Sequence, residues 1–185
     1  MCIRDRPVAS QEASAPFSVP SREGWRPESV ALPPAFAPTF PHQGLAELRF
    51  SPGMFDAERE DFWSYLMVWW VPEKTEIGAN SLADDLAVYY RGLIGVVAPG
   101  QGFDPASVAV EVSLDPAKDG GFQGYATILD AFATGKAITL AVRIDRIACS
   151  AAEHVALVFS LTPQASDHAI WKDLDALRDG FACTS

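Results

Sequence analysis

Three aromatic side chains that recur at strand spacing are the strongest candidates for a ligand site. The segment 62–71, FWSYLMVWWV, holds three of the five tryptophans of the chain. Because side chains alternate across a strand, Trp63, Tyr65 and Trp69 are predicted to share one face. Three large rings left in water would form an extended apolar patch, so this face needs a cover. The cover is expected to be a Pro-rich arm, a second subunit, or an unknown small apolar or sugar-like ligand.

Two cysteines are candidates for a disulfide. Cys149 ends a predicted strand and Cys183 ends the last predicted helix. A helix packed on the sheet could bring their Cα atoms within the roughly 4.4–6.8 Å that a disulfide requires. Two reduced cysteines are the alternative. The third cysteine, Cys2, belongs to the suspected N-terminal remnant described below and is left out of this pairing.

The three histidines carry little signal for catalysis. His42, His154 and His168 show no H-x-H or H-E-x-x-H spacing, and the cysteines form no C-x-x-C motif, so neither a metal site nor a cofactor is predicted. No G-x-S-x-G elbow is present, and Asp130 stands where a phosphate-binding loop would need its first glycine. No catalytic residue is therefore assigned. A small hydrolase that uses His168 or His154 with a nearby acid remains the alternative, and the acidic residues of 56–61 are expected to form a solvated connector.

Composition limits the class of protein and the partners. A chain of 185 residues with 49% hydrophobic residues predicts one domain. The net charge is −10 and basic residues do not cluster, so nucleic acid is not an expected partner. The longest apolar run, 66–71, is far shorter than the roughly 18 residues that suggest a membrane span. No membrane span is predicted for this acidic protein.

The chain divides into three segments. Residues 1–23 are expected to form a disordered leader, in which MCIRDR at 1–6 resembles a translated adapter remnant. Residues 24–43 are rich in proline and carry Trp25, Phe36 and Phe40, which predicts an extended arm packed on the body. Residues 44–185 are predicted to form a single α+β domain. The small residues of the leader resemble the stretch after a secretory cleavage site, which favours a periplasmic or secreted protein over a cytoplasmic one.

Hydrophobic periodicity predicts the order of elements in this domain. Alternating apolar residues predict strands over 45–50, 62–71, 107–114, 124–129, 137–149 and 154–161. Helical spacing predicts one helix within 80–100 and a second after Ser166, whose apolar residues form a single stripe. The expected fold is α+β, with a mostly antiparallel sheet of about six strands, the order ββαββββα, and both helices packed on one face. The segment 62–71 is expected in the middle of the sheet with both faces shielded.

Several segments together resemble a known group of proteins. LRFSPGMFD, FWSYLMVWWV, LADDLAVYYRGL, VRIDRIAC and HAIWKDLDALRDGFAC are similar to a family of uncharacterised bacterial proteins, many of them exported, over about residues 24–183. That resemblance implies no activity. A final strand leading into a helix that ends in an aromatic residue is similar to the photosystem P-subunit-like sandwich, a fold used for binding and assembly. The resulting expectation is a non-catalytic binding or assembly module whose partner is an unknown small ligand or a protein.

Overall fold

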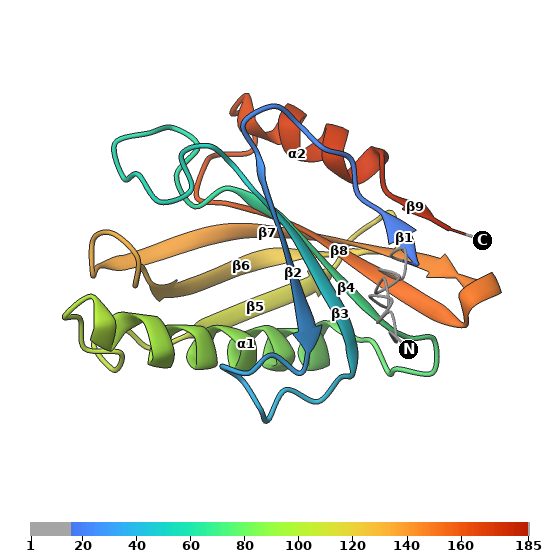
Figure 1. The fold of residues 1–185 in the computed structure, drawn as a ribbon, viewed down its shortest axis with the longest axis horizontal. Coiled ribbons are helices and arrows are strands. Elements are labelled where there is room, and N and C mark those ends of the chain that lie inside the picture. The colour runs from blue at the N-terminus through green and yellow to red at the C-terminus, as the bar shows by residue number, and fades with distance from the viewer. Residues whose placement is uncertain (1–15, 185) are drawn as a thin grey trace, which may run out of the picture.

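The computed structural model describes residues 16–184 of the chain. The predicted remnant at 1–6 and the first part of the predicted leader lie outside the described residues. The described chain is an α+β protein whose main sheet has seven antiparallel strands, in the order β2-β3-β4-β8-β7-β6-β5 (Figure 1). A second, two-stranded sheet pairs β1 near the start of the described chain with β9 near its end.

The elements have the following bounds: β1 Phe17–Ser18, β2 Arg26–Leu32, β3 Gly44–Phe50, β4 Tyr65–Pro72, α1 Ala79–Gly100, β5 Glu111–Pro116, β6 Phe122–Leu129, β7 Ala137–Cys149, a short 3-10 helix Ser150–Ala152, β8 His154–Thr162, α2 Ile170–Asp179 and β9 Ala182–Cys183. The predicted α+β class and antiparallel sheet are therefore confirmed. The predicted strands all have counterparts in the sheet. The main sheet contains seven strands, one more than the six expected. Together with the two helices, these strands follow the order βββαββββα instead of the predicted ββαββββα.

The additional strand, β2, lies inside the segment that was predicted to be an extended Pro-rich arm. It pairs with β3 along its whole length, from Arg26 opposite Phe50 to Leu32 opposite Gly44. Pro27 argued against a strand at this position because proline cannot donate a ladder hydrogen bond. At the edge of a sheet that missing donor is tolerated, and β2 is an edge strand. Residues 26–32 of the predicted arm are therefore a strand of the main sheet, and a loop follows them.

Strand β4 lies between β3 and β8, as expected for the tryptophan-rich segment, and seven of its eight residues are buried. Tyr65, Met67 and Trp69 belong to the larger of two hydrophobic cores. Leu66, Val68 and Trp70 belong to the smaller core on the other face. Both faces of this strand are therefore buried, which confirms the prediction that both would be shielded from solvent.

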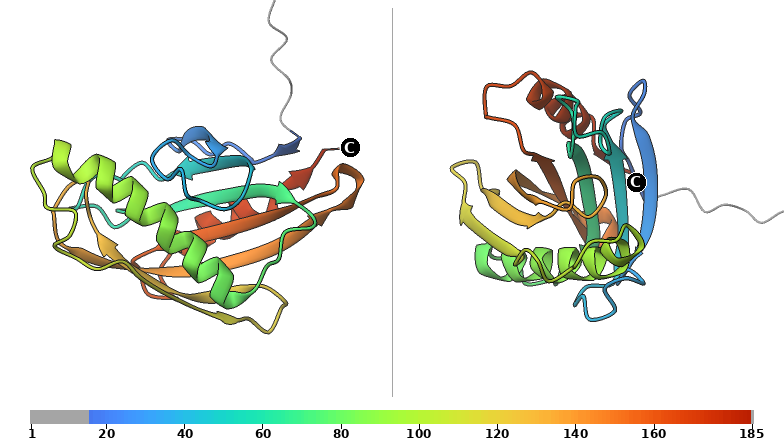
Figure 2. Two further views of the ribbon diagram at one scale, coloured as in Figure 1. Left: turned by 90° about the horizontal axis from the view of Figure 1, so that it is seen from below. Right: turned by 90° about the vertical axis from the view of Figure 1, so that its left-hand side faces the viewer.

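The two helices cover opposite faces of the sheet. Helix α1 lies across the concave face, where the sheet curves around it, and its buried residues belong to the larger core (Figure 2). Helix α2 packs on β4 and β8 from the other side, and its apolar stripe belongs to the smaller core. The prediction that both helices pack on one face is wrong. Because β4 is apolar on both faces, each face needs its own helix.

Residues 16–25, which we call the N-terminal strap, run over the α2 side of the sheet. Phe17 is buried, and its ring centroid lies 5.0 Å from that of Trp70. Arg49 on β3 donates from Nη2 to the carbonyl oxygen of Val19 at 3.0 Å. The prediction of a disordered leader is therefore wrong for residues 16–23. The composition of residues 16–23 gave no sign that Phe17 would be buried. It also gave no sign that β1 would pair with β9, which lies near the other end of the chain.

Cys149 and Cys183 are joined by a disulfide, with their Cα atoms 5.7 Å apart and a separation of 34 positions in sequence. Cys149 lies at the end of β7, in the main sheet, and Cys183 lies in β9. Because β9 pairs with β1, the bridge ties both the C-terminal strand and the N-terminal strap to the main sheet.

Replacing Cys183 by Ser is expected to lower the free energy of unfolding by about 4 kcal/mol, because the unfolded chain gains the freedom of a loop spanning 34 residues. Urea denaturation in a Cys2→Ser background measures this loss without competing thiol exchange. Reducing the parent protein should reproduce the variant, and the variant should not respond to reductant. Equal unfolding midpoints for the oxidised parent and the variant would contradict the assignment.

Candidate functional site

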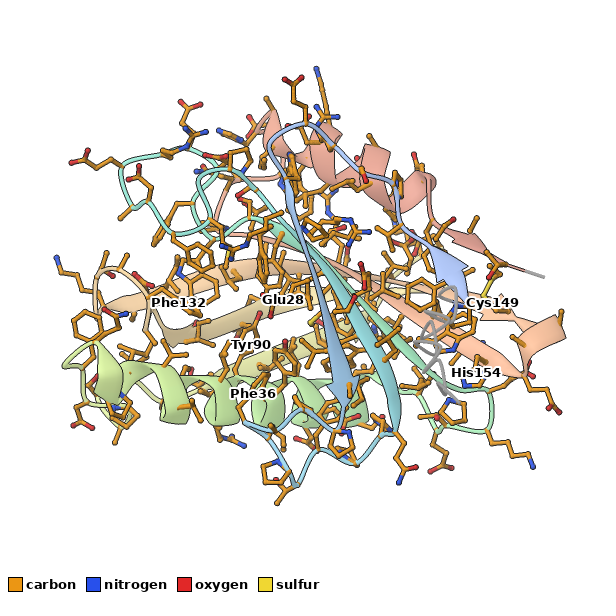
Figure 3. The ribbon with its side chains drawn as sticks, viewed as in Figure 1. Glu28, Phe36, Tyr90, Phe132, Cys149 and His154 are labelled. Atoms are coloured by element: carbon orange, nitrogen blue, oxygen red, sulfur yellow. A yellow bond between two sulfur atoms is a disulfide. The ribbon has the colours of Figure 1, made fainter. Side chains whose placement is uncertain are left out.

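The concave side of the sheet is not filled completely. A cavity of about 200 Å³ lies between the first strands of the sheet, α1 and two loops, and we call it the aromatic cleft (Figure 3). It is lined by Arg26, Glu28, Phe36, Leu48, Phe50, Met54, Phe55, Trp63, Tyr65, Tyr89, Leu93 and Phe132. Ten of these twelve residues are apolar or aromatic, and the other two, Arg26 and Glu28, are charged residues of β2. An enclosed apolar cavity with few polar groups is the usual form of a small-ligand site.

The loop between β3 and β4 is held by its own polar groups. Ser51 donates from Oγ to the carbonyl oxygen of Asp61 at 2.6 Å, and the amide of Gly53 donates to Asp61 Oδ2 at 2.8 Å. A Cβ atom at Gly53 would lie 2.0 Å from Asp61 Oδ1, so a larger residue here would displace the Asp61 side chain. Burial works to raise the pKa of Asp61, but hydrogen bonds from Arg59 and Gly53 outweigh it and hold that pKa below its ordinary value. These bonds fix the loop that carries Met54 to the cleft wall.

Trp63 is positioned by a single buried carboxylate. It precedes β4 with a positive φ of 52°, a conformation that is rare outside glycine. Its indole Nε1 donates to Asp130 Oδ1 at 2.9 Å, and both side chains are buried. This bond joins the loop before β4 to the loop after β6, two segments that are 67 residues apart.

Asp130 also orders the loop that supplies Phe132. Its carboxylate accepts hydrogen bonds from the amides of Phe132, Ala133 and Thr134 at 3.1, 3.2 and 2.7 Å. Burial works to raise the pKa of Asp130, but the hydrogen bonds from Thr134, Trp63 and the loop backbone together place it below its ordinary value. The carboxylate therefore remains ionised and holds two walls of the aromatic cleft in place.

The tyrosine hydroxyls near the cleft are neutral and largely satisfied. The hydroxyls of Tyr65 and Tyr90 form a hydrogen bond with each other. Burial raises the pKa of both groups well above the ordinary value of a tyrosine. Because the polar atoms of Trp63 and Tyr65 are already engaged, these side chains offer the cleft mainly their apolar ring surfaces.

The three predicted ligand-binding aromatics do not all reach the cleft. Trp63 and Tyr65 line it, whereas Trp69 lies outside it and is fully buried. The ring of Phe40, from the loop after β2, packs on Trp69 at 4.9 Å between centroids, and Phe159 packs on it at 4.5 Å. The Pro-rich segment therefore covers Trp69 with Phe40, and it contributes Phe36 to the wall of the aromatic cleft.

Most cleft residues outside β4 were not singled out from the sequence. Phe55 and Phe132 lie in loops, where aromatic side chains have no periodic pattern to mark them. One local signal was present at 130–132. An acidic residue directly after an apolar strand, such as Asp130, commonly accepts hydrogen bonds from the backbone of the turn that follows it. Arg26 and Glu28 carried no such signal, because β2 was not expected as a strand.

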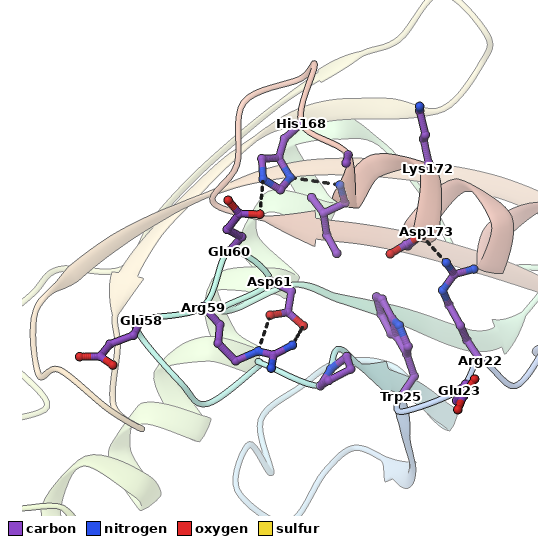
Figure 4. A pocket seen from close by; sticks show the side chains of 13 residues that line it. Arg22, Glu23, Trp25, Glu58, Arg59, Glu60, Asp61, His168, Lys172 and Asp173 are labelled. Atoms are coloured by element: carbon purple, nitrogen blue, oxygen red, sulfur yellow. Dashed lines mark hydrogen bonds and ion pairs between the residues drawn. The ribbon is translucent and has the colours of Figure 1, made fainter.

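A second pocket, of about 770 Å³, lies between the N-terminal strap, the loop 51–64 and the start of α2, and we call it the charged pocket (Figure 4). Four of its eight charged side chains pair with one another, whereas Glu23, Glu58 and Lys172 form no ion pair within residues 16–184. Arg59 Nε bonds to Asp61 Oδ1 at 2.9 Å, and Arg22 bonds to Asp173. Internal pairing of exposed groups uses up the charges that could bind a ligand.

His168, in the charged pocket, is the histidine whose surroundings come closest to those expected for the alternative hydrolase site. The amide of Ile170 donates to His168 Nδ1 at 3.1 Å, so the neutral ring carries its proton on Nε2. Nε2 faces Glu60 Oε2 at 3.9 Å, and the Glu60 side chain is 90% exposed. A nitrogen that already carries a proton cannot act as a general base. The pocket wall also contains no serine, threonine or cysteine among the described residues.

The other two histidines have structural partners. His42 Nε2 lies 2.6 Å from Asp85 Oδ2, which ties the loop after β2 to α1. His154 stacks on Trp70 with ring centroids 4.9 Å apart, and its Nδ1 lies 2.6 Å from the carbonyl oxygen of Ala152. Neither residue lines the aromatic cleft or the charged pocket.

Within residues 16–184, no group of three or more His, Cys, Asp or Glu side chains is arranged to hold a metal ion. Neither α1 nor α2 combines the length and the apolar character that a membrane crossing requires. Further pockets of about 350 and 300 Å³ lie beside Arg143 and Trp171 and beside Asp145 and Arg178.

Replacing Trp63 by Phe is expected to lower the free energy of unfolding by at least about 2 kcal/mol at pH 7, because a hydrogen bond to a charged group is lost. Since the pKa of Asp130 is lower in the folded than in the unfolded chain, this stabilisation is present above about pH 4 and is lost as the pH falls through the folded-state pKa. Urea denaturation at pH 7 and pH 3.5 measures the change. Trp69→Phe is the matched control, because Trp69 Nε1 has no hydrogen-bond partner among the described residues. A pH-independent cost for Trp63→Phe would contradict the role of Asp130.

Replacing His168 by Gln is expected to leave hydrolysis of p-nitrophenyl acetate unchanged, because His168 Nε2 carries the proton and cannot accept another. Initial rates for parent and variant at pH 7 test this directly. A general base contributes roughly 100-fold or more to a rate. A fall of that size in the variant would show that the hydrolase alternative is correct.

Comparison with known proteins assigns neither pocket. No protein-family model, no curated protein and no solved structure matches this chain. The resemblances to uncharacterised bacterial proteins and to the photosystem P-subunit-like sandwich therefore remain predictions. The function has to be inferred from the geometry of the two pockets.

Proposed function

We propose that this protein is a non-catalytic binding module that takes up a small apolar ligand in the aromatic cleft. The observation that carries this proposal is a partly open cleft of about 200 Å³ with a mainly aromatic wall. A cavity of about 150 Å³ lined by apolar side chains is known to bind benzene. The aromatic cleft therefore suits a single ring with a short substituent or a fused pair of rings.

The chemistry of the wall favours an apolar ring over a sugar. Sugar hydroxyls need hydrogen-bond partners when they leave water, and unpaired ones cost free energy. Trp63 Nε1 is bonded to Asp130, and the hydroxyl of Tyr65 is bonded to Tyr90. The ring faces that remain prefer edge-to-face or offset contact with another aromatic system.

The hydrogen bonds that hold the wall of the aromatic cleft support a role in ligand binding. Buried cavities in proteins are normally closed by small shifts of the surrounding side chains. Here the Asp130 carboxylate and the Asp61 carboxylate fix the two loops that carry Phe132, Met54 and Phe55. Hydrogen-bonded loops of this kind keep the space open without a ligand, which lowers the cost of binding.

We also propose that the protein works outside the cytoplasm. The disulfide between Cys149 and Cys183 supports this, because such bridges persist in oxidising compartments. Cys183 belongs to an exposed two-residue strand, where a reducing cytosol would have ready access to the bridge. The small-residue character of the leader points the same way.

Replacing Leu93 by Trp is expected to abolish binding of indole, because Leu93 on α1 lines the cleft and a larger ring there fills it. Binding to the parent is expected with a dissociation constant on the order of 1 mM or tighter, and the variant should be at least about tenfold weaker. Saturation-transfer NMR and calorimetric titration with indole measure both.

Val96→Trp is the matched control, since it adds the same side chain to the same helix at a position that is 64% exposed and outside the cleft. Thermal unfolding of both variants shows that they are folded. Equal binding of indole by Leu93→Trp and the parent would place the ligand elsewhere and overturn the proposal.

A further inference from the structure

The mouth of the aromatic cleft carries two opposite charges on one strand. Arg26 and Glu28 lie two residues apart on β2, so their side chains are on the same face of the sheet. Both residues line the cleft and both are exposed. Among residues 16–184, neither forms an ion pair with another side chain.

The positive charge is held against the aromatic wall. The guanidinium carbon of Arg26 lies 5.3 Å from the ring centroid of Phe50 and 4.9 Å from that of Phe55. Both rings also line the cleft. Two cation–π contacts hold the guanidinium at the entrance of the cleft.

The negative charge lies beside the opposite wall. Tyr89 reaches the cleft from α1, and burial followed by the charge of Glu28 raises its pKa. Glu28 and Tyr89 both line the aromatic cleft, Glu28 from β2 and Tyr89 from α1. Figure 3 places Glu28, Phe36 and Phe132 around this region.

We propose that the ligand of the aromatic cleft is a small aromatic zwitterion, of which an aromatic α-amino acid is the simplest form. This inference rests on the proposed function of the cleft. The ring enters the apolar cavity, the carboxylate of the ligand pairs with Arg26, and its ammonium group pairs with Glu28. Alternate strand positions are about 6.6 Å apart along β2, which two flexible side chains can span to reach both charges of one small ligand.

A ligand with one charge is a poorer match to this entrance. A carboxylate alone would gain Arg26 but face the negative Glu28, and an amine alone would gain Glu28 but face Arg26. A neutral ring would leave both charges without a partner. Only the zwitterion meets each side chain with the opposite charge.

Edge strands also carry charged residues to prevent pairing with other chains, and Pro27 between the two positions fits that role. Protection of an edge requires charge but does not require a guanidinium held on two rings of a cavity wall. The two explanations make different predictions for ligand binding.

Four probes with one ring system separate the contributions: 3-methylindole, tryptamine, indole-3-propionate and L-tryptophan. Calorimetric titration at low salt is expected to rank L-tryptophan tightest. Arg26→Met keeps an apolar stem over the rings and should weaken L-tryptophan and indole-3-propionate by roughly fivefold, but not tryptamine. Glu28→Gln should weaken L-tryptophan and tryptamine by roughly fivefold, but not indole-3-propionate. Arg91→Met and Glu111→Gln are the matched controls, because both residues are exposed and lie outside the cleft.

The outcomes separate this inference from the proposed function. If the probes bind, Leu93→Trp abolishes their binding, and L-tryptophan is no tighter than 3-methylindole, the cleft is a binding site but the zwitterion is wrong. Indole-3-propionate binding tighter than L-tryptophan would identify an anionic ligand and would also overturn the inference. If Leu93→Trp changes the binding of no probe, the proposed function fails together with the inference. Selective loss of each charged probe in its own variant supports both.

Discussion

The structure depends on one strand that is apolar on both faces. Between Tyr65 and Val71, every residue of β4 is buried, so neither side of the strand can face water. The strand is therefore central, and each side of the sheet acquires a helix and a further segment of chain. On the concave side these are α1 and the loop after β2, and on the other side they are α2 and the N-terminal strap. The disulfide completes the second cover by tying β9 and the strap to the main sheet.

The aromatic cleft arises where the first of these covers is incomplete. Near Trp69 the loop after β2 brings Phe40 onto the strand and seals it. Near Trp63 and Tyr65 the loop after β6 forms part of the cleft wall, and the buried Asp130 carboxylate holds that loop in position. A buried carboxylate is costly unless several donors surround it, so the bonds that stabilise the charge also fix the cavity wall. Stability and the shape of the cleft thus come from the same interactions.

The two pockets differ in how their polar groups are used. In the charged pocket, Arg59 pairs with Asp61, Arg22 pairs with Asp173, and His168 is held by a backbone amide. In the aromatic cleft the interior is apolar, and the charges stand only at its entrance. Apolar surface and unpaired charges both favour contact with a ligand, whereas paired charges do not. The apolar and mainly aromatic wall, rather than pocket size, is the reason for placing the proposed ligand in the smaller cleft.

The sequence by itself determined the class of fold, the position of β4 and the alternation of its side chains. These properties depend on local periodicity, which a strand or helix carries in its own residues. The sequence also identified Trp63 and Tyr65 as candidates for a ligand site and the two cysteines as candidates for a disulfide. Clustered large rings need a cover, and two thiols at suitable places can form a bridge. Only the tertiary structure decided that the helices take opposite faces, that residues 26–32 form an edge strand, and that residues 16–23 belong to the fold. Each of these depends on which distant segment supplies a partner, and an amphipathic stripe does not specify which face it will cover. The cleft itself depends on bonds across 67 residues between Trp63 and Asp130, which no local pattern records.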